Sequence, residues 1–179
     1  MQRVPINLYE YAGYILAQLP KGLLLNTAAN GKMDTMTIGW GSIGTNWGLP
    51  IFTAFVRQSR YTHTLLEANP EFTISIPLPE SDVRQILGYC GTVSGRDHNK
   101  FTELNLTVYK GQNVSSPAIY QLPITLECKV LYEQEQDPKA IPAHLVSRYY
   151  SNGDYHTMYI AQIVAAYMLA QEEVKVTSV

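Results

Sequence analysis

The alternation of apolar and polar residues along the 179-residue chain predicts a β-rich protein with short helices. Apolar side chains recur at helical spacing from Leu8 to Leu19, and Pro20 ends this stripe. Shorter runs rich in β-forming residues follow, and the Asn30-Gly31 pair indicates a tight hairpin turn within residues 29–32. The predicted strands are residues 22–28, 35–40, 51–56, 72–76, 124–135 and 155–167.

Three further helices are predicted from capping and stop signals. Ser59 or Thr62 is a suitable N-cap for a helix that ends at Asn69, and Ser81 for a helix that runs to Leu87. A third helix is expected at residues 97–104, and residues 138–150 are irregular or loosely helical. Because strands outnumber helices and do not alternate with them regularly, the pattern favours a barrel over a parallel βαβ sheet.

Neither an internal repeat nor a linker interrupts the chain, so residues 1–179 are expected to form a single domain. Charged residues make up 16% of the chain, below the usual share of about a quarter. Thirteen Tyr stand against four Phe. Few charges and many tyrosines are typical of a subunit interface, so we expect a homodimer; the alternative is a tyrosine-rich monomer.

Charge and hydropathy argue against several partners. The formal net charge is −2 and Lys and Arg form no run, so we expect no nucleic-acid partner. No apolar run approaches the length of a membrane span, and the N-terminus lacks the apolar core of a signal peptide. We therefore expect a cytoplasmic protein with no membrane partner.

Metal and thiol chemistry find little support in the sequence. Cys90 and Cys128 provide neither a disulfide framework nor metal spacing, and a buried structural thiol is the favoured interpretation of Cys90. The four His are scattered without ligand spacing, so no metal site is expected.

A glycine-rich stretch at residues 34–48 contains Gly39, Gly41 and Gly44 in a formal G-x-G-x-x-G pattern. The dinucleotide fingerprint requires a helix after this pattern, and Gly48 and Pro50 would break one. We interpret the stretch instead as a loop whose bare backbone lies against a flat ligand. A Val at position 41 is then expected to hinder docking of that ligand and to leave the fold intact.

Two further segments have the composition of anion sites. Arg57, Arg60 and the hydroxyl residues between and after them stand at a predicted strand-to-helix junction, where helix N–H groups and bidentate cations favour a phosphate. The alternative is a helix cap with solvated arginines. Residues 90–100 form a second such loop with two Gly, but without the ending of a P-loop; the alternative there is a solvated helix entry. His156, at the start of a long strand, is by itself typical of a structural histidine.

Taken in order, four segments resemble the flavin reductase-like FMN-binding split-barrel family, especially its flavoredoxin-type branch. They are Met36-Thr-Ile-Gly-Trp-Gly41, Arg57-Gln-Ser-Arg-Tyr-Thr62, Cys90-Gly-Thr-Val-Ser-Gly-Arg-Asp97 with Lys100-Phe101, and Tyr155-His-Thr-Met-Tyr-Ile160. The resemblance implies a mainly β split barrel with short helices, which forms a homodimer with FMN at or near the subunit interface.

The resemblance also implies roles for individual residues. The stretch along the isoalloxazine ring comprises Met36, Thr37, Ile38, Gly39, Trp40, Gly41 and Ser42. The residues around the ribityl phosphate are Arg57, Ser59, Arg60, Tyr61 and Thr62. The cofactor-binding residues of the third segment are Cys90, Gly91, Ser94, Gly95 and Lys100, the last three closing over the phosphate. His156 is a ring-side or substrate-side residue.

One position departs from the family pattern, in which Asn commonly stands where this chain has Asp34. A carboxylate near the electron-rich edge of a flavin would disfavour its anionic reduced form. Two interpretations stay open: Asp34 points away from the flavin, or it lowers the flavin's potential.

The resemblance implies an oxidoreductase that takes electrons from NAD(P)H onto FMN and passes them to a flavin, a metal complex or a protein. Because the cofactor performs the redox chemistry, no protein nucleophile or acid–base pair is required. One alternative is a flavoredoxin-like electron-transfer protein that does not oxidise NAD(P)H. Another is a ligand-binding split barrel without redox turnover.

Overall fold

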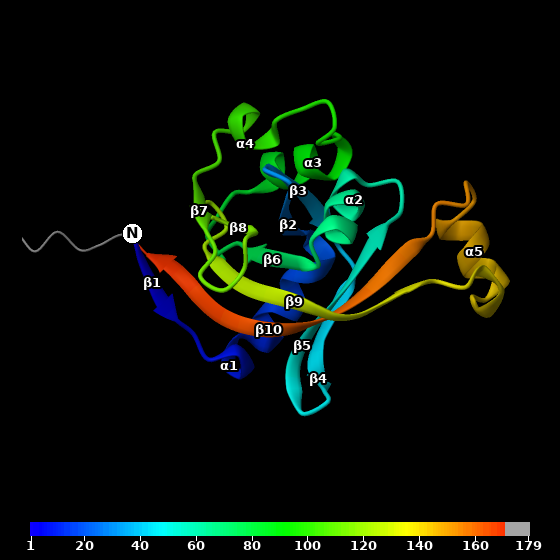
Figure 1. The fold of residues 1–179 in the computed structure, drawn as a ribbon, viewed down its shortest axis with the longest axis horizontal. Helices are drawn as coiled ribbons and strands as arrows, with labels where there is room; N and C mark the ends of the chain where they lie inside the picture. Colours follow the sequence, from blue (N-terminus) through cyan, green and yellow to red (C-terminus); the bar gives the residue numbers. More distant parts are fainter. Residues whose placement is uncertain (171–179) are drawn as a thin grey trace, which may run out of the picture.

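The computed structural model describes residues 1–170, whose strands form one eight-stranded antiparallel sheet and a two-stranded sheet. The large sheet curls into a split barrel (Figure 1). Its strand order is β3 (Lys32–Ile38), β2 (Leu23–Ala29), β6 (Glu71–Ile76), β9 (Ile124–Glu135), β10 (His156–Ala170), β5 (Leu49–Arg57) and β4 (Gly41–Asn46), and β1 (Gln2–Pro5) pairs with the far end of β10. The small sheet pairs β7 (Val108–Lys110) with β8 (Pro117–Ile119).

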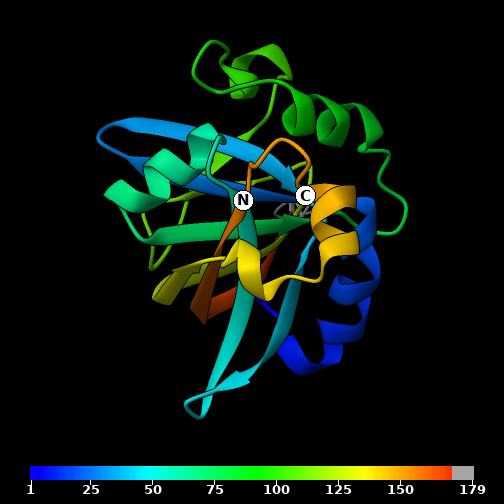
Figure 2. The same cartoon turned by 90° about the vertical axis from the view of Figure 1, so that its right-hand side faces the viewer.

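Short helices cover the barrel on different sides. They are α1 (Leu8–Gln18), α2 (Tyr61–Ala68), α3 (Arg84–Thr92), α4 (Lys100–Glu103) and α5 (Ala143–Tyr149), with 3-10 turns at Leu19–Lys21 and Pro138–Ala140. Figure 2 shows α3 and α4 above the β2–β3 hairpin and α1 against another side of the barrel. The segment with α5 lies at the outer ends of β9 and β10, away from the barrel body (Figure 1).

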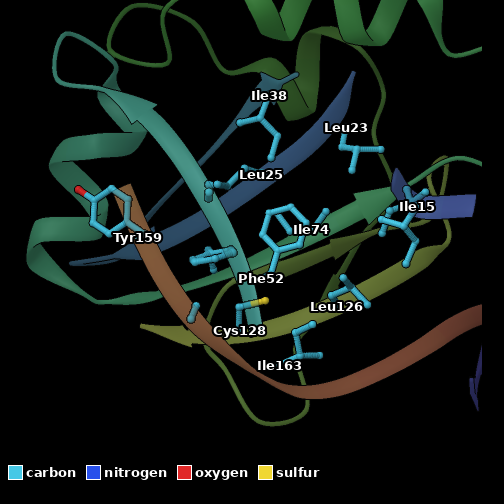
Figure 3. Close-up of a cluster of buried hydrophobic side chains, with 14 of the residues drawn as sticks. Ile15, Leu23, Leu25, Ile38, Phe52, Ile74, Leu126, Cys128, Tyr159 and Ile163 are labelled. Carbon is cyan, nitrogen blue, oxygen red and sulfur yellow. The ribbon is translucent and has the colours of Figure 1, made fainter. Parts of the chain in front are cut away.

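The barrel interior is a single cluster of apolar side chains from nearly every large strand. Phe52 lies at its centre with Ile74, Leu126 and Cys128 around it (Figure 3). Ile15 of α1 is buried in the same cluster together with Leu8 and Leu19, so most of the predicted helical stripe packs on the barrel, whereas Leu16 is exposed. Each such side chain contributes about 1.5–3 kcal/mol on full burial, which makes this cluster the main source of stability.

Local sequence signals placed several elements correctly. Helix α1 and strand β9 lie where they were predicted, and β2, β3, β5, β6 and β10 differ from prediction only near their ends. The turn at Asn30 and Gly31 has positive φ at both residues, 52° and 72°, as a type I′ hairpin requires. Hydrophobic periodicity and turn chemistry act over a few residues, so they can be recognised without the fold.

The predicted start of α2 was wrong because the expected capping side chains have tertiary partners. Helix α2 begins at Tyr61 with Arg60 at its N-cap, and neither Ser59 nor Thr62 caps it. Ser59 instead hydrogen-bonds Asp154, and the Thr62 hydroxyl donates to the Asp34 carboxylate.

Two more helix boundaries differ from prediction. Helix α3 begins at Arg84 after Val83, not at a cap on Ser81, and it continues through Thr92. Cys90 and Gly91 are therefore helical rather than part of a loop. Helix α4 is a single turn that begins at Lys100 after the N-cap Asn99, so residues 97–99 precede it.

The glycine-rich stretch is largely a strand, which corrects the loop interpretation. Residues 41–46 form β4 and pair with β5, from Gly41 opposite Ala54 to Asn46 opposite Leu49. Glycine has low intrinsic strand propensity, so this strand exists because β5 supplies its hydrogen bonds. The short strands β1, β7 and β8 were also not predicted, since three or four residues carry little periodicity.

Within residues 1–170, no helix has both the length and the apolar character that crossing a bilayer requires. The last residues of the predicted 1–179 domain, 171–179, lie outside the described part of the chain.

Candidate functional site

The ends of β3 and β5 and the start of β10 enclose a cavity of about 150 Å³, here called the central cavity. Antiparallel pairing brings β5 and β10 together, with His156 opposite Arg57 and Met158 opposite Phe55. The lining residues are Met36, Thr37, Ile38, Gly39, Trp40, Phe55, Arg57, Arg60 and His156. Three of the four segments singled out in the sequence therefore meet here.

The residues that follow one another along β3 offer the central cavity mainly their backbone. The side chains of Met36 and Ile38 are buried in the barrel core. The Thr37 hydroxyl donates to the Leu87 carbonyl of α3 at 2.6 Å. Gly39 and Trp40, just past the strand, are exposed. A flat ligand here would meet main-chain groups and an indole ring rather than charged side chains.

A second, apolar cavity of about 480 Å³ adjoins the first and shares Gly39, Trp40 and Phe55 with it. Its other lining residues are Leu16, Leu19, Pro20, Gly41 and Gln136. No charged side chain belongs to this lining, so the two cavities together form a surface that is apolar at one end and cationic at the other.

Gly41 is required by the barrel rather than by a ligand. A Cβ at this position would lie 2.7 Å from the Thr53 carbonyl oxygen and 3.2 Å from the Phe52 ring. A Val there would separate β4 from β5, so the expectation that it leaves the fold intact was wrong. Ser42, the next residue, is exposed on β4 and lines neither cavity.

Trp40 and His156 line the central cavity and are packed against aromatic residues of the segment before β10. The Trp40 ring lies 4.8 Å from the His156 ring and 5.2 Å, edge-on, from Tyr149 at the end of α5. Tyr150 stacks on Tyr155 at 4.7 Å, with an angle of 19° between the rings. Long-range packing of the α5 segment thus sets the position of the indole.

His156 is neutral at pH 7 in this environment. Burial, with the nearby Arg57 charge as the next cause, lowers its pKa to about 4. Its Nδ1 lies 2.9 Å from the Tyr150 hydroxyl, and that hydroxyl lies 2.8 Å from Oε1 of Gln136. When the hydroxyl donates to Gln136, the His156 Nδ1–H donates to Tyr150, and Nε2 is left as the hydrogen-bond acceptor of the ring.

Two of the residues predicted to surround a phosphate are held by the loop before β10. The Arg57 guanidinium donates to the carbonyls of Asp154 and Tyr149 and lies over the Tyr150 ring. Ser59 donates its backbone N–H and its hydroxyl to the Asp154 carboxylate, at 3.1 and 2.7 Å. Carbonyl and carboxylate oxygens of the protein itself thus occupy these donors.

Three more of the predicted residues surround Asp34. Lys100 Nζ lies 3.0 Å from Asp34 Oδ1, and the Thr62 hydroxyl donates to Oδ2 at 2.7 Å. A Cβ at Gly95 would lie only 2.1 Å from Oδ1, so glycine is required for the loop to pass this carboxylate. Asp34 is therefore buried with its charge compensated, and it lines a further cavity of about 570 Å³ together with Tyr61, Gly95 and Lys100.

Arg60 was also predicted to bind the phosphate, and its guanidinium has no partner within residues 1–170. Its guanidinium forms no hydrogen bond or ion pair with any residue in 1–170, and it lines the central cavity. Tyr61 follows as the first residue of α2, whose first-turn N–H groups have few partners inside the helix. An anion at this point would meet a cation and the positive end of a helix.

The remaining predictions for the third segment find less support. Cys90 is fully buried in the core under α3, and burial raises the pKa of its thiol to about 11. Gly91 packs against Thr37, and the Ser94 hydroxyl accepts the Arg96 N–H. None of these three lines the central or the apolar cavity, so their assignment to the cofactor site stays a prediction.

Sequence reasoning missed the residues that organise the site from a distance. Asp154 and Tyr150 directly precede the His156 segment, and their acidic and aromatic character beside it was the available signal. No local pattern marked Gln136 or Phe55. Among residues 1–170, no group of three or more His, Cys, Asp or Glu side chains is arranged to hold a metal ion.

Residues 16–176 match the flavin reductase like domain family. The chain belongs to this family. An uncharacterized protein of Archaeoglobus fulgidus is 28% identical over 135 residues, which cover 75% of this chain and 71% of that protein.

Solved structures agree with this membership. The flavoredoxin of Methanosarcina acetivorans is similar with a TM-score of 0.64 and 25% identity, over 84% of this chain and 69% of that one. An FMN-binding domain of a flavin reductases-like enzyme from Shewanella baltica has a TM-score of 0.67 at 18% identity, over 93% and 77%. The NADH:FAD oxidoreductase of Streptomyces globisporus has a TM-score of 0.61 at 15%, over 83% and 75%. The last two establish the fold alone.

Proposed function

We propose that the chain is an FMN-binding oxidoreductase that takes electrons from NAD(P)H onto FMN and passes them to a flavin, a metal complex or a protein. The observation that supports it most is the uncommitted Arg60 cation on the same cavity as the exposed backbone after β3. A flavin mononucleotide combines a flat, largely apolar ring with a phosphate dianion. The two adjoining cavities offer apolar surface for the ring at one end and the Arg60 cation for the phosphate at the other.

The residues present fit such a cofactor. The ring would lie along residues 36–40 and reach toward the apolar cavity, where Trp40 and Phe55 line both hollows. The phosphate would lie at Arg60 and the start of α2. When bound, FMN supplies hydride and single-electron transfer chemistry, so the site needs no protein nucleophile.

The chain's own residues orient the ligand and keep the site neutral apart from its cationic end. Trp40 is fixed by Tyr149 and His156, so the wall does not have to be ordered on binding. His156, neutral at pH 7, offers a hydrogen-bonding nitrogen to the cavity without adding a charge.

The test is spectroscopic. The purified protein is mixed with FMN, separated from free flavin, and examined for visible absorption; it is then titrated with NADH or NADPH without oxygen. We expect retained yellow colour and bleaching on addition of the nicotinamide. A colourless protein that does not take up FMN would rule out the proposal.

An electron-transfer flavoprotein without NAD(P)H oxidation is the second candidate. The 25% identity to a flavoredoxin, against 15% to the NADH:FAD oxidoreductase, favours it. In the same titration this candidate predicts that FMN is retained but is bleached only by a protein or chemical reductant. The single experiment therefore separates the two candidates.

We also propose that the protein acts as a homodimer. Large apolar side chains are exposed at Trp47 on the tip of the β4–β5 hairpin and at Leu131 and Tyr132 on β9. These join the low charge content and the many tyrosines as features of an interface. Sedimentation equilibrium is expected to return twice the chain mass of 20.1 kDa.

A further inference from the structure

Lys100 is a buried cation that does not line the central cavity; together with Asp34 it lines a separate cavity of about 570 Å³ beside the β2–β3 turn. Its side chain and that of Asp34 are each only 3% exposed, and their charged atoms lie 3.0 Å apart. A second Lys100 contact is the Thr35 carbonyl at 2.6 Å. Both contacts come from β3, so the ammonium is anchored to the strand across from α4.

The same carboxylate has a partner on each of its oxygens. Lys100 takes Oδ1, the Thr62 hydroxyl takes Oδ2, and Gly95 packs against the group without room for a Cβ. Asp34 thus joins β3 to the first turn of α2, to α4 and to the loop between α3 and α4. Of these segments, β3 lines the central cavity with Arg60, α2 begins directly after Arg60, and Arg96 of the loop donates to the Ser59 carbonyl.

The charge balance of the pair determines whether Lys100 is available to bind an anion. Asp34 and Lys100 sum to zero, and neither is solvated. Turning Lys100 toward a ligand would leave Asp34 buried without its counter-charge, which is strongly unfavourable. Arg60 carries no such constraint within residues 1–170.

We propose that Asp34 and Lys100 form a neutral positioning pair, and that a bound phosphate is recognised by Arg60 and not by Lys100. Only the statement about phosphate recognition rests on the proposed FMN site. The pair shapes the phosphate side of the cleft by holding α2 and the 95–100 loop against β3. It adds no net charge there.

The decisive measurement is the ratio of the affinities for FMN and riboflavin, which differ only by the phosphate. It is determined by flavin fluorescence titration for the wild type, Asp34→Asn, Lys100→Met and the double variant Asp34→Asn/Lys100→Met. The double variant removes both charges at once. We expect its ratio to stay within about threefold of the wild type, because a neutral pair has been replaced by a neutral pair.

The single variants move the ratio in opposite directions. Asp34→Asn leaves the ammonium uncompensated and is expected to raise the preference for FMN, whereas Lys100→Met leaves a carboxylate uncompensated and lowers it. If Lys100 contacted the phosphate, the double variant would lose about tenfold or more of the preference for FMN. That result would overturn the assignment.

Measurements of thermal stability test the Asp34–Lys100 pair independently of flavin binding. Thermal denaturation without flavin is expected to show a larger loss of Tm in each single variant than in the double variant, because only the single variants bury an unpaired charge. Additive losses would overturn the pairing. If the wild type bound neither flavin, the proposed function and the phosphate half would fail together, while the denaturation cycle would still decide the pair.

Discussion

The two sides of the central cavity are built by different forces. On the aromatic side, Trp40, Tyr150 and His156 are held by ring packing and a short chain of hydrogen bonds that ends at Gln136. On the polar side, main-chain carbonyls and the Asp154 carboxylate hold Arg57, the Asp34–Lys100 pair lies outside the cavity lining, and Arg60 is left without a partner among residues 1–170. One side excludes charge and the other compensates it.

This difference teaches which residues of a cationic segment are available to a ligand. Arg57, Ser59, Thr62 and Lys100 all look like anion ligands in the sequence, yet each donates to an oxygen of the protein itself. Desolvated donors need partners whether or not a ligand is bound, so a folded site satisfies most of them internally.

The largest expected effect is the destabilisation of the aromatic side when His156 is protonated at low pH. The unfolded chain protonates His156 near the ordinary His pKa of about 6.5, and the folded protein near about 4. The unfolded state therefore binds more protons between these values, and stability falls as the pH drops through that window, by about 3 kcal/mol in the limit.

Replacement by Gln removes this titration. We expect His156→Gln to lose less unfolding free energy than the wild type between pH 7 and pH 4.5, measured by urea denaturation. His144→Gln is the matched control, since His144 is exposed on α5 and does not line the central cavity. An unchanged slope in His156→Gln would show that the buried imidazole does not cause the acid sensitivity.

The next largest effect concerns FMN binding by Arg60 on the polar side. Arg60→Ala is expected to weaken FMN binding by about 1.5–3 kcal/mol, because a charge-assisted contact to the phosphate is lost. Riboflavin affinity, which involves no phosphate, stays near the wild-type value. Arg84→Ala is the control, because that arginine is exposed, pairs with Asp82 and does not line the central cavity. Equal FMN affinity in Arg60→Ala and wild type would place the phosphate elsewhere.

A smaller effect tests how closely Gly95 packs against the Asp34 carboxylate. Gly95→Ala places a methyl group 2.1 Å from Asp34 Oδ1, so the loop or the carboxylate must move, at a cost of about 1–3 kcal/mol. Gly88→Ala is the control within α3, where a Cβ meets no atom within 4 Å. Thermal denaturation is expected to show a clear loss for the first and none for the second. Similar Tm values would mean that the carboxylate gives way freely.

The smallest effect concerns a donor that the protein already uses. Ser59→Ala removes an exposed hydrogen bond to Asp154 and is expected to cost no more than about 1 kcal/mol of stability, with FMN affinity nearly unchanged. Denaturation and flavin titration measure the two quantities. A tenfold loss of FMN affinity would instead assign the Ser59 hydroxyl to the phosphate.

The predictability of each element followed the range of the interactions that stabilise it. Strand β9 and the Asn30-Gly31 turn were recognised because alternation and turn chemistry are local. Strand β4 was not, because its glycines acquire strand conformation only by pairing with β5. The starts of α2 and α3 were missed because the expected caps have distant partners or none.

The candidate site divided in the same way. The sequence singled out residues 36–40, Arg60 and His156, and the structure brings them to one cavity. It also singled out Cys90, whose burial no local pattern revealed, and Asp34, whose direction stayed open. The partner of Asp34 is 66 positions away at Lys100 (100 − 34), and that of Ser59 is 95 away at Asp154, so neither contact has a local signature.

By itself, the sequence determined the β-rich class, the hairpin, the family and the set of residue types that gather at the cleft, because these depend on short-range patterns and on ordered motifs. Only the tertiary structure decided which polar groups remain for a ligand. Asp34 and Asp154 reach donors from far along the chain, and whether a donor is already paired depends on three-dimensional proximity rather than on its neighbours in sequence. Once these carboxylates take their partners, Arg60 is the predicted phosphate residue with its charge uncommitted within residues 1–170.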